Sequence, residues 1–350
     1  MIADIWFGLI AFSLMMYVVL DGYDLGIGIA SLFERNRERR TEKVEIVATA
    51  WDGNESWIIL MAVALWGGLP EAFGALLPAI YLPIIVMLFG IILRGAAIEL
   101  SVSLRSDAWI TVFGIGSLIV AIAQGFAIGG VLQGISHDDG VFNGGTWDFL
   151  SWYSVLTAVA TVAVYVVAGA AFGQLKSEGE SARAARRLGL STLLVGIPIV
   201  AVTAIWSMDL LPQQLTGGRV VLFWALVVVA VIATAATIWG FRSGPDAAAM
   251  VGVVVAEISG MLALVVGMVP IVVPPDMTIS EAAAPHSALT FLLVGIGLNV
   301  PLVLFYNWYA HHVFRGKYRP VEERPAGVTQ AGWAMRAGGE RASDEQEVRS

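Results

Sequence analysis

Long apolar stretches separated by short polar connections make up most of this chain. A helix that crosses a membrane needs about 20 mainly apolar residues. Nine stretches qualify: residues 5–32, 49–69, 73–99, 108–133, 149–174, 188–207, 219–241, 247–272 and 287–313. Short connections favour antiparallel neighbours in helical bundles. The pattern predicts an all-α polytopic protein with one nine-helix transmembrane domain, residues 1–313, and a polar tail, residues 314–350, that we expect to be mobile.

Composition narrows the functional classes. Charged residues are 14% of the chain, against about 25% in soluble domains, which excludes an ordinary soluble domain. The chain has no cysteine, so disulfides, iron–sulfur clusters and covalently attached haem are excluded. Its four histidines have neither bis-His haem spacing nor a zinc motif, and we predict no metal here. A basic stripe for nucleic acid is also lacking, and we expect the first helix, rather than a removable signal peptide, to direct insertion.

The basic residues are distributed unevenly. Of the 20 Lys and Arg residues, 18 lie in the tail or in the connections after the first, third, fifth and seventh stretches. The other connections contain none except Arg219, at the edge of the seventh stretch. Because Lys and Arg concentrate on the cytoplasmic side, we predict an N-terminus outside and a C-terminus in the cytoplasm. This orientation requires an odd number of spans, which nine satisfies.

Six ionisable residues interrupt the first three stretches at a similar depth. Asp21 lies about 16 residues into the first stretch, or ~24 Å at 1.5 Å per residue. The second stretch enters from that same side, and the third ends there. The six residues are Asp21, Asp24, Asp52, Glu55, Arg94 and Glu99. Charge at membrane depth is costly and marks a functional site or a buried ion pair. One arginine cannot neutralise five carboxylates, so we predict a proton-handling cluster in which some carboxyl groups hold a proton.

Polar residues also lie deeper. Glu257 is ~15 Å into the eighth stretch, near the membrane midplane, and is either a proton-pathway residue or a protonated acid bonded to a neighbouring helix. Gln124 lies in the outer half of the fourth stretch. Gly26 and Gly28 follow the acids of the first stretch, and small residues of this kind allow helices to pack closely.

Each acid also has a structural interpretation. Thr49 and Asp52 fit a capping box at the start of the second stretch, where an acid is simply favourable. Asp21 or Asp24 is also in a suitable position to be a simple structural ion-pair partner for Arg94. All six residues lie at one depth, and every charge buried in the membrane adds a free-energy cost. The group as a whole therefore favours a functional interpretation over a structural one.

Four segments resemble the second subunit of cytochrome bd-type quinol oxidases. They are DGYDLGIG (21–28), WDGNESW (51–57), LRGAAIEL (93–100) and YNWYAHHVFRGKY (306–318). Their order and spacing, and the nine-helix topology, match that family along essentially the whole chain. The third segment is similar to members of the cyanide-insensitive branch.

The resemblance implies a fold of two four-helix bundles plus one peripheral helix, in the bacterial cytoplasmic membrane. It implies a larger homologous partner, subunit I, that carries the quinol site, two b-type haems and one d-type haem, or a b-type haem in that position in the cyanide-insensitive branch. Together they would oxidise quinol at the outer face and reduce O2 to water with cytoplasmic protons, separating charge without pumping. No redox centre is expected in this chain.

The resemblance also assigns individual residues. The proton-path aspartate of the family's WDGN motif maps onto Asp52, and the preceding tryptophan maps onto Trp51. Trp51 and Trp57 are candidates for the subunit interface or for the structural quinone that some members bind. Glu55 stands where other members have Gln. The predicted proton path therefore comprises Asp21, Asp24, Asp52, Glu55, Glu99 and Glu257, with Arg94 as the charge partner.

Two other functions stay open at this point. A stand-alone ion-coupled transporter would use the same acids, but such proteins often have inverted repeats and broken helices at the midplane. The acidic cluster is off-centre and we find no convincing repeat. A purely structural scaffold would tolerate neutralisation of the whole cluster.

Overall fold

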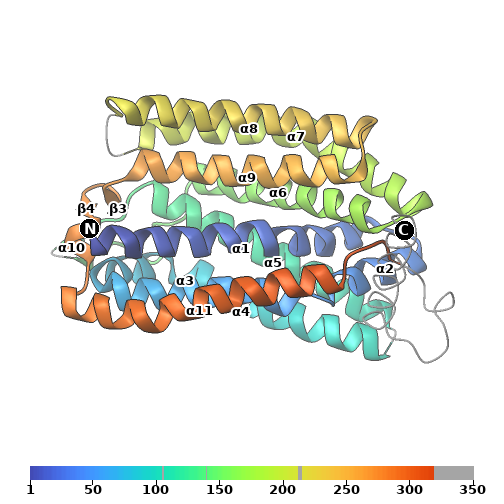
Figure 1. Cartoon of the computed structure of the whole chain (residues 1–350), viewed down its shortest axis with the longest axis horizontal. Helices are drawn as coiled ribbons and strands as arrows, with labels where there is room; N and C mark the ends of the chain where they lie inside the picture. Colours follow the sequence, from blue (N-terminus) through green and yellow to red (C-terminus); the bar gives the residue numbers. More distant parts are fainter. Residues whose placement is uncertain (105, 139, 212–214, 319–350) are drawn as a thin grey trace, which may run out of the picture.

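The structure is a computed structural model that describes residues 1–318 except 105, 139 and 212–214. Long helices lie side by side along its long axis (Figure 1). The helices are α1 (Ile2–Phe33), α2 (Arg37–Val47), α3 (Trp51–Gly68), α4 (Pro70–Leu104), α5 (Asp107–Leu132), α6 (Trp152–Lys176), α7 (Gly179–Leu210), α8 (Gly218–Arg242), α9 (Asp246–Met268), α10 (Ile279–Ala282) and α11 (His286–Val313). Most of the predicted tail, residues 319–350, lies outside the described residues.

Eight of the described helices are long and apolar enough to cross a membrane. They are α1, α4, α5, α6, α7, α8, α9 and α11. Of the nine predicted stretches, the one whose helix lies outside this set is the second, which forms α3; this helix has 18 residues and carries Asp52, Asn54 and Glu55 in its first two turns. These polar side chains lower its hydropathy, so its role as a ninth span stays a prediction.

The connections contain more regular structure than the sequence predicted. The basic segment after the first span, predicted as a loop, forms α2, whose start is capped by Asn36 accepting from the Arg39 N–H at 3.0 Å. The fold is all-helical, as predicted, apart from two short antiparallel hairpins in the connections. They are β1 (His137–Asp138) with β2 (Val141–Phe142), and β3 (Ile271–Val273) with β4 (Met277–Thr278). The eighth predicted stretch, 247–272, ends early at Met268 because Pro270 and β3 follow.

Side-chain contacts show which helix ends lie together. At one end, Arg37 of α2 pairs with Asp107 of α5 at 3.2 Å, and Lys317, after α11, pairs with Asp246 of α9. We call this the basic end; it contains α2, the start of α7 and residues 314–318. At the opposite end, the Trp6 indole of α1 donates to the Leu289 carbonyl of α11 at 3.1 Å. Successive long helices therefore run in alternate directions.

The one basic residue that breaks the charge asymmetry has a structural partner. Arg219, at the start of α8, donates to the Val266 carbonyl at 2.7 Å and also to the Val269 carbonyl. These carbonyls lie at the C-terminal end of α9, where helix carbonyls lack intrahelical partners and attract cations. Arg219 thus stabilises a helix end at the face opposite the basic end.

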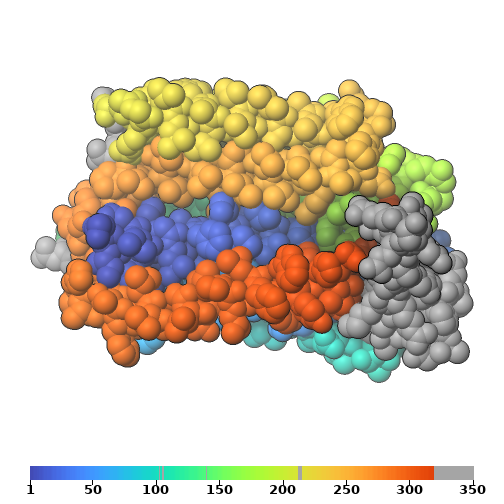
Figure 2. Space-filling model, viewed as in Figure 1, coloured from blue at the N-terminus to red at the C-terminus, as the bar shows by residue number. Residues whose placement is uncertain are grey.

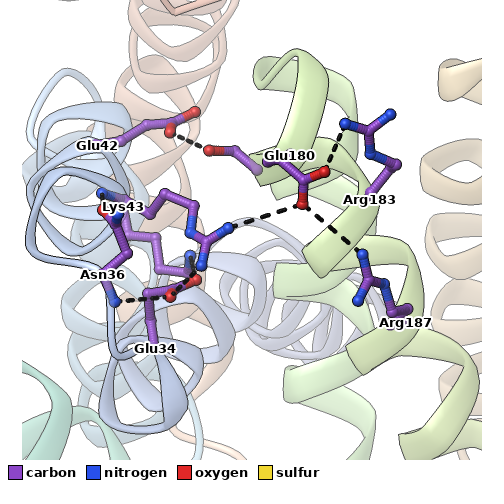
Figure 3. Close-up of polar contacts among 9 residues, drawn as sticks. Glu34, Asn36, Glu42, Lys43, Glu180, Arg183 and Arg187 are labelled. Carbon is purple, nitrogen blue, oxygen red and sulfur yellow. Dashed lines mark hydrogen bonds and ion pairs between the residues drawn. The ribbon is translucent and has the colours of Figure 1, made fainter.

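Ion pairs connect α1, α2 and α7 at the basic end (Figure 3). Glu34 accepts from Arg39 at 3.0 Å and lies 3.5 Å from Lys43, and Arg39 also reaches Glu180 of α7 at 4.0 Å. Burial opposes the charge on Glu34, but the Asn36 backbone N–H, Lys43 and Arg39 outweigh it and lower the pKa of Glu34. Burial also lowers the pKa of Lys43, against the attraction of Glu34.

Small residues set the distance between α1 and its neighbours, as the sequence predicted for Gly26 and Gly28. A Cβ atom at Gly26 would lie 1.7 Å from the Tyr165 carbonyl oxygen of α6, and one at Gly28 would lie 2.1 Å from the Ser117 hydroxyl of α5. On α6, a Cβ at Gly169 would meet the Gly26 backbone at 2.3 Å. Glycine at these positions lets α1 lie directly against α5 and α6.

The last long helix lies on the outside of the molecule. Figure 2 shows α11 along one flank, beside α1. Its buried residues are Leu289 and Asn307, and large apolar side chains such as Phe291 and Leu298 are 79% and 72% exposed. Beyond it, residues 314–318 lie against the end of α6, where Lys176 donates to the Phe314 carbonyl at 2.8 Å.

We predict that Gly26→Ala destabilises the protein. The new Cβ atom would overlap backbone rather than a movable side chain, so α1 and α6 must separate, at a cost of about 1–3 kcal/mol. The measurement is the thermal unfolding midpoint in detergent. Gly8→Ala is the control, since nothing lies within 4 Å of its Cβ position on the same helix. Equal midpoints for the two variants would contradict the prediction.

Candidate functional site

Three helices bring buried charges together. The Arg94 guanidinium of α4 donates to the Asp21 carboxylate of α1 at 2.5 Å and lies 3.7 Å from the Glu55 carboxylate of α3. Arg94 and Asp21 are fully buried, and Glu55 is 9% exposed. Arg94 and Asp21 therefore form a desolvated ion pair with a second acid beside it. We call Asp21, Asp24, Glu55 and Arg94 the charge cluster.

Asp24 enters the cluster through a different partner. It lies three residues beyond Asp21, on the same face of α1, and is 1% exposed. The Asn54 side-chain amide of α3 donates to the Asp24 carboxylate at 2.8 Å. The same amide nitrogen also donates to the Tyr23 hydroxyl at 2.8 Å. Asn54 therefore connects a buried carboxyl group to a buried phenol.

From Tyr23 the network continues to α11. The Tyr23 ring stacks on Phe172 with centroids 4.1 Å apart, and its hydroxyl is 2.7 Å from His311 Nε2. His311 Nδ1 is 2.8 Å from the Asn307 carbonyl, which can only accept. In a neutral imidazole, Nδ1 then carries the proton and Nε2 accepts from Tyr23. His311 is partly exposed and lies in the last turn of α11, toward the basic end.

A second set of hydrogen bonds crosses the molecule further from the basic end. The Gln124 amide of α5 donates to the Tyr17 hydroxyl of α1 at 2.5 Å. The Tyr165 hydroxyl of α6 donates to the Gln124 side-chain oxygen at 2.6 Å. Tyr17 and Tyr165 are 1% and 2% exposed, and Gln124 is 6% exposed. These two bonds connect three buried polar side chains from three helices.

Other predicted site residues lie apart from the cluster. Asp52 and Glu99 are exposed, although Asp52 is near enough to Glu55 to act on it electrostatically. Glu257 is 9% exposed, and neither of its carboxyl oxygens has a hydrogen-bond partner among the described residues. The capping-box alternative was wrong: α3 begins after Ala50 without a side-chain cap, and the Thr49 hydroxyl donates to the Ile46 carbonyl at 3.1 Å.

The two candidate tryptophans differ in accessibility. Trp57 is fully buried and meets the Phe12 ring edge-on, with centroids 5.6 Å apart. Its indole N–H has no hydrogen-bond partner among the described residues. Trp51 is only partly buried and lies against Gly95, where a Cβ atom would be 3.1 Å from its ring. Trp51 is therefore the more available of the two at a surface.

Carboxyl groups outnumber cationic groups in the charge cluster. Among the described residues, one guanidinium faces three carboxyl groups, and Asp21 Oδ2, Asp24 Oδ1 and Glu55 Oε1 have no hydrogen-bond partner. Buried polar atoms usually have partners, so these three atoms are available to protons or mobile donors. Within the same described residues, no group of three or more His, Asp or Glu side chains could hold a metal ion.

Sequence reasoning missed several members of these networks. Asn54 and Tyr23 lie inside the two acidic segments, so their position beside the acids was a usable signal. His311 belongs to no haem or zinc motif, so nothing in the sequence singled it out, but the Asn307 carbonyl one turn earlier fixes its tautomer. The sequence around Tyr165 does not predict its role, because only the packing of α6 on α1 brings this residue near Tyr17 and Gln124.

Comparison with known proteins gives three similarities. The chain is 25% identical over 329 residues to cytochrome bd ubiquinol oxidase subunit 2 of Bacillus subtilis (strain 168), covering 89% of this chain and 95% of that protein. It is 26% identical over 214 residues to cytochrome bd-I ubiquinol oxidase subunit 2 of Escherichia coli (strain K12), and this region covers 58% of this chain and 56% of that protein. Its fold is similar to that of a chain in the structure of bd oxidase from Geobacillus thermodenitrificans, with a TM-score of 0.75 and 14% sequence identity. The similarity covers 89% of this chain and 98% of that chain.

The sequence also matches one protein family over residues 2–314, described as cytochrome bd terminal oxidase subunit II. This match confirms the family predicted from the four sequence segments and favours an oxidase subunit over a stand-alone transporter. Eight apolar helices and the bacterial relatives agree with a multi-pass protein of the bacterial inner membrane. The chain therefore belongs to the cytochrome bd terminal oxidase subunit II family.

Proposed function

We propose that this chain is the non-haem subunit of a quinol:oxygen oxidoreductase, and that it supports a larger haem-bearing subunit I and contributes to proton uptake from the cytoplasm. The observation that carries the proposal is the family match over residues 2–314. Quinol would be oxidised and O2 reduced to water in subunit I, and the reaction would separate charge across the membrane without pumping. The stand-alone transporter has no comparable support.

The proposed topology has nine spans. In addition to the eight apolar helices, α3 would cross as the ninth, since it lies against α1 and α11 and its polar turns face the charge cluster. One four-helix bundle would contain α1, α3, α4 and α5, and a second α6, α7, α8 and α9, with α11 peripheral. The basic end would face the cytoplasm, because Lys and Arg concentrate there.

In this orientation, the acids line a route for protons from the cytoplasm. Asp52 and Glu99 are exposed and would collect protons, and Asp21, Asp24 and Glu55 would hold them inside. Arg94 would keep the buried acids from repelling one another, and Glu257 would be the deepest acid. An excess of carboxyl groups over guanidinium is costly at this depth, which supports a functional rather than a structural role.

The proposed cofactors belong to the partner. Subunit I would hold two b-type haems and one d-type haem, or a b-type haem in that position if the chain belongs to the cyanide-insensitive branch. In α11 the two adjacent histidines have other contacts: His311 bonds Tyr23 and Asn307, and His312 stacks on Trp308. A structural quinone in this subunit would lie near Trp51 or Trp57. The buried Trp57 N–H, which has no hydrogen-bond partner in the part of the chain that the structure describes, offers one donor for a carbonyl oxygen.

The proposal is tested by isolating the tagged chain from native membranes. We expect a larger subunit to co-purify, with haem bands in the reduced-minus-oxidised spectrum and quinol-dependent oxygen uptake. A colourless chain that purifies alone from cells expressing the candidate partner would contradict the proposal. Substrate movement by that lone chain in liposomes would support the transporter instead.

We predict that Asp52→Asn slows oxygen reduction while the haem spectrum is preserved. Loss of a proton-collecting carboxylate should lower turnover roughly tenfold, or ~1.4 kcal/mol on the barrier. The measurement is quinol-dependent oxygen consumption by the purified complex. Glu38→Gln is the control, because it neutralises an exposed acid of α2. Normal turnover and proton uptake in Asp52→Asn would remove this residue from the route, and loss of haem would make its role structural.

We predict that Arg94→Gln destabilises the protein more than the double variant Asp21→Asn/Arg94→Gln. Removing one partner of a buried ion pair leaves an uncompensated charge and costs about 3–5 kcal/mol, whereas removing both charges costs less. The thermal unfolding midpoint of the purified complex measures the difference. If the single and double variants unfold at the same temperature, Arg94 does not act as the charge partner of Asp21.

A further inference from the structure

Tyr17, Gln124 and Tyr165 form a bridge between two regions that each contain buried acid. The bridge runs from α1 through α5 to α6, with bonds of 2.5 and 2.6 Å. At one end, Tyr17 is one turn before Asp21 on α1 and close enough to interact with it electrostatically. At the other end, Tyr165 interacts in the same way with Glu257 of α9.

The donors in the bridge all point the same way. Tyr165 gives its only hydroxyl hydrogen to Gln124, so the Tyr165 oxygen can only accept further bonds. The Gln124 amide donates to the Tyr17 oxygen, which leaves the Tyr17 hydrogen free for an acceptor such as the Asp21 carboxylate. Glu257 has no hydrogen-bond partner among the described residues, and it acts on Tyr165 electrostatically. The two hydrogen bonds of the bridge are ordered from Tyr165 through Gln124 to Tyr17, with each group donating to the next.

The surroundings of Glu257 leave few other partners. The helices packed against α9 are chiefly α8, α6 and α1. The charged residues of α8, Arg219 and Arg242, lie at its two ends. From α6, Tyr153 and Lys176 are likewise near the ends, which leaves Tyr165. On α1, Asp4 lies in the first turn, and Tyr23 and Asp24 are already bonded to Asn54. The titratable groups of α1 that remain to act on Glu257 are Tyr17 and Asp21. An unpaired buried carboxylate is strongly unfavourable, so Glu257 is expected to hold a proton, and Tyr165 is the bridge residue with which it interacts electrostatically.

We propose that Tyr17, Gln124 and Tyr165 are positioning residues that couple the proton held by Glu257 to the charge state of the Asp21–Arg94 pair. Glu257 thus acts as a proton-storing group whose proton affinity changes when that pair gains or loses a proton. The inference rests on the proposed function for its physiological meaning. Its physical content concerns only the described residues of this chain.

The test uses acid-minus-alkaline infrared difference spectra of the purified complex. The carboxylic acid band that disappears in Glu257→Gln is assigned to Glu257. We expect Tyr165→Phe to shift this band, because the hydroxyl dipole that interacts electrostatically with Glu257 is lost. We expect Asp21→Asn to move the midpoint pH of the band by about one unit, a tenfold change in proton affinity. In a Gln124→Leu background, Asp21→Asn should leave the midpoint in place.

The control is Tyr153→Phe, which removes another buried hydroxyl from α6, one that bonds Ser207 at 2.6 Å; it should leave the band and its midpoint unchanged. The proposal is wrong if Tyr165→Phe does not shift the band, if Tyr153→Phe shifts it equally, or if Asp21→Asn moves the midpoint by the same amount with and without Gln124. Should Gln124→Leu fail to assemble, Tyr165→Phe serves as the background. The spectra need no turnover, so a complex that fails to reduce O2 refutes the proposed function without deciding this inference.

Discussion

The buried pair of Arg94 and Asp21 is the interaction on which the arrangement of α1, α3 and α4 depends. Both side chains are fully buried, and a buried ion pair is tolerated only with close geometry and further hydrogen bonds. The 2.5 Å contact with Asp21 and the adjacent Glu55 fix α4 against α1 and α3. Asp24 and Glu55 lie beside this ion pair, so the charge cluster has more carboxyl groups than guanidinium groups. The proposed function uses this excess of acids.

Close helix packing makes the wider polar network possible. Gly26 and Gly169 let α1 and α6 meet backbone to backbone, which brings Tyr165 to the same layer as Tyr17 and Gln124. On the other side of the cluster, Asn54 and Tyr23 extend the network to His311 near the basic end. One set of hydrogen bonds therefore reaches from a partly exposed histidine of α11 to α1 and α3, and a second set connects α1, α5 and α6.

The sequence allowed prediction of the long helices, the uneven charge distribution and the acids of α1, α3 and α4, because apolar length and buried charge are local signals. It did not allow prediction of α2, which is short and mostly polar, or of the hairpins at the opposite end. The polar partners were harder to predict. Tyr165 and His311 join the networks through contacts between residues far apart in the chain, and no periodicity encodes such contacts. Glu99 shares the predicted depth of the cluster but lies on the exposed face of α4, which depth alone could not distinguish.

The most direct test of the charge cluster is proton uptake during a single turnover with O2, measured in oriented proteoliposomes that contain the complex. Asp24→Asn replaces a buried carboxyl group that Asn54 holds at 2.8 Å, and the amide preserves its shape. The account predicts that proton uptake from the side of the basic end slows while electron transfer to the haems keeps its rate. Unchanged proton uptake in Asp24→Asn, with the haem spectrum intact, would contradict it.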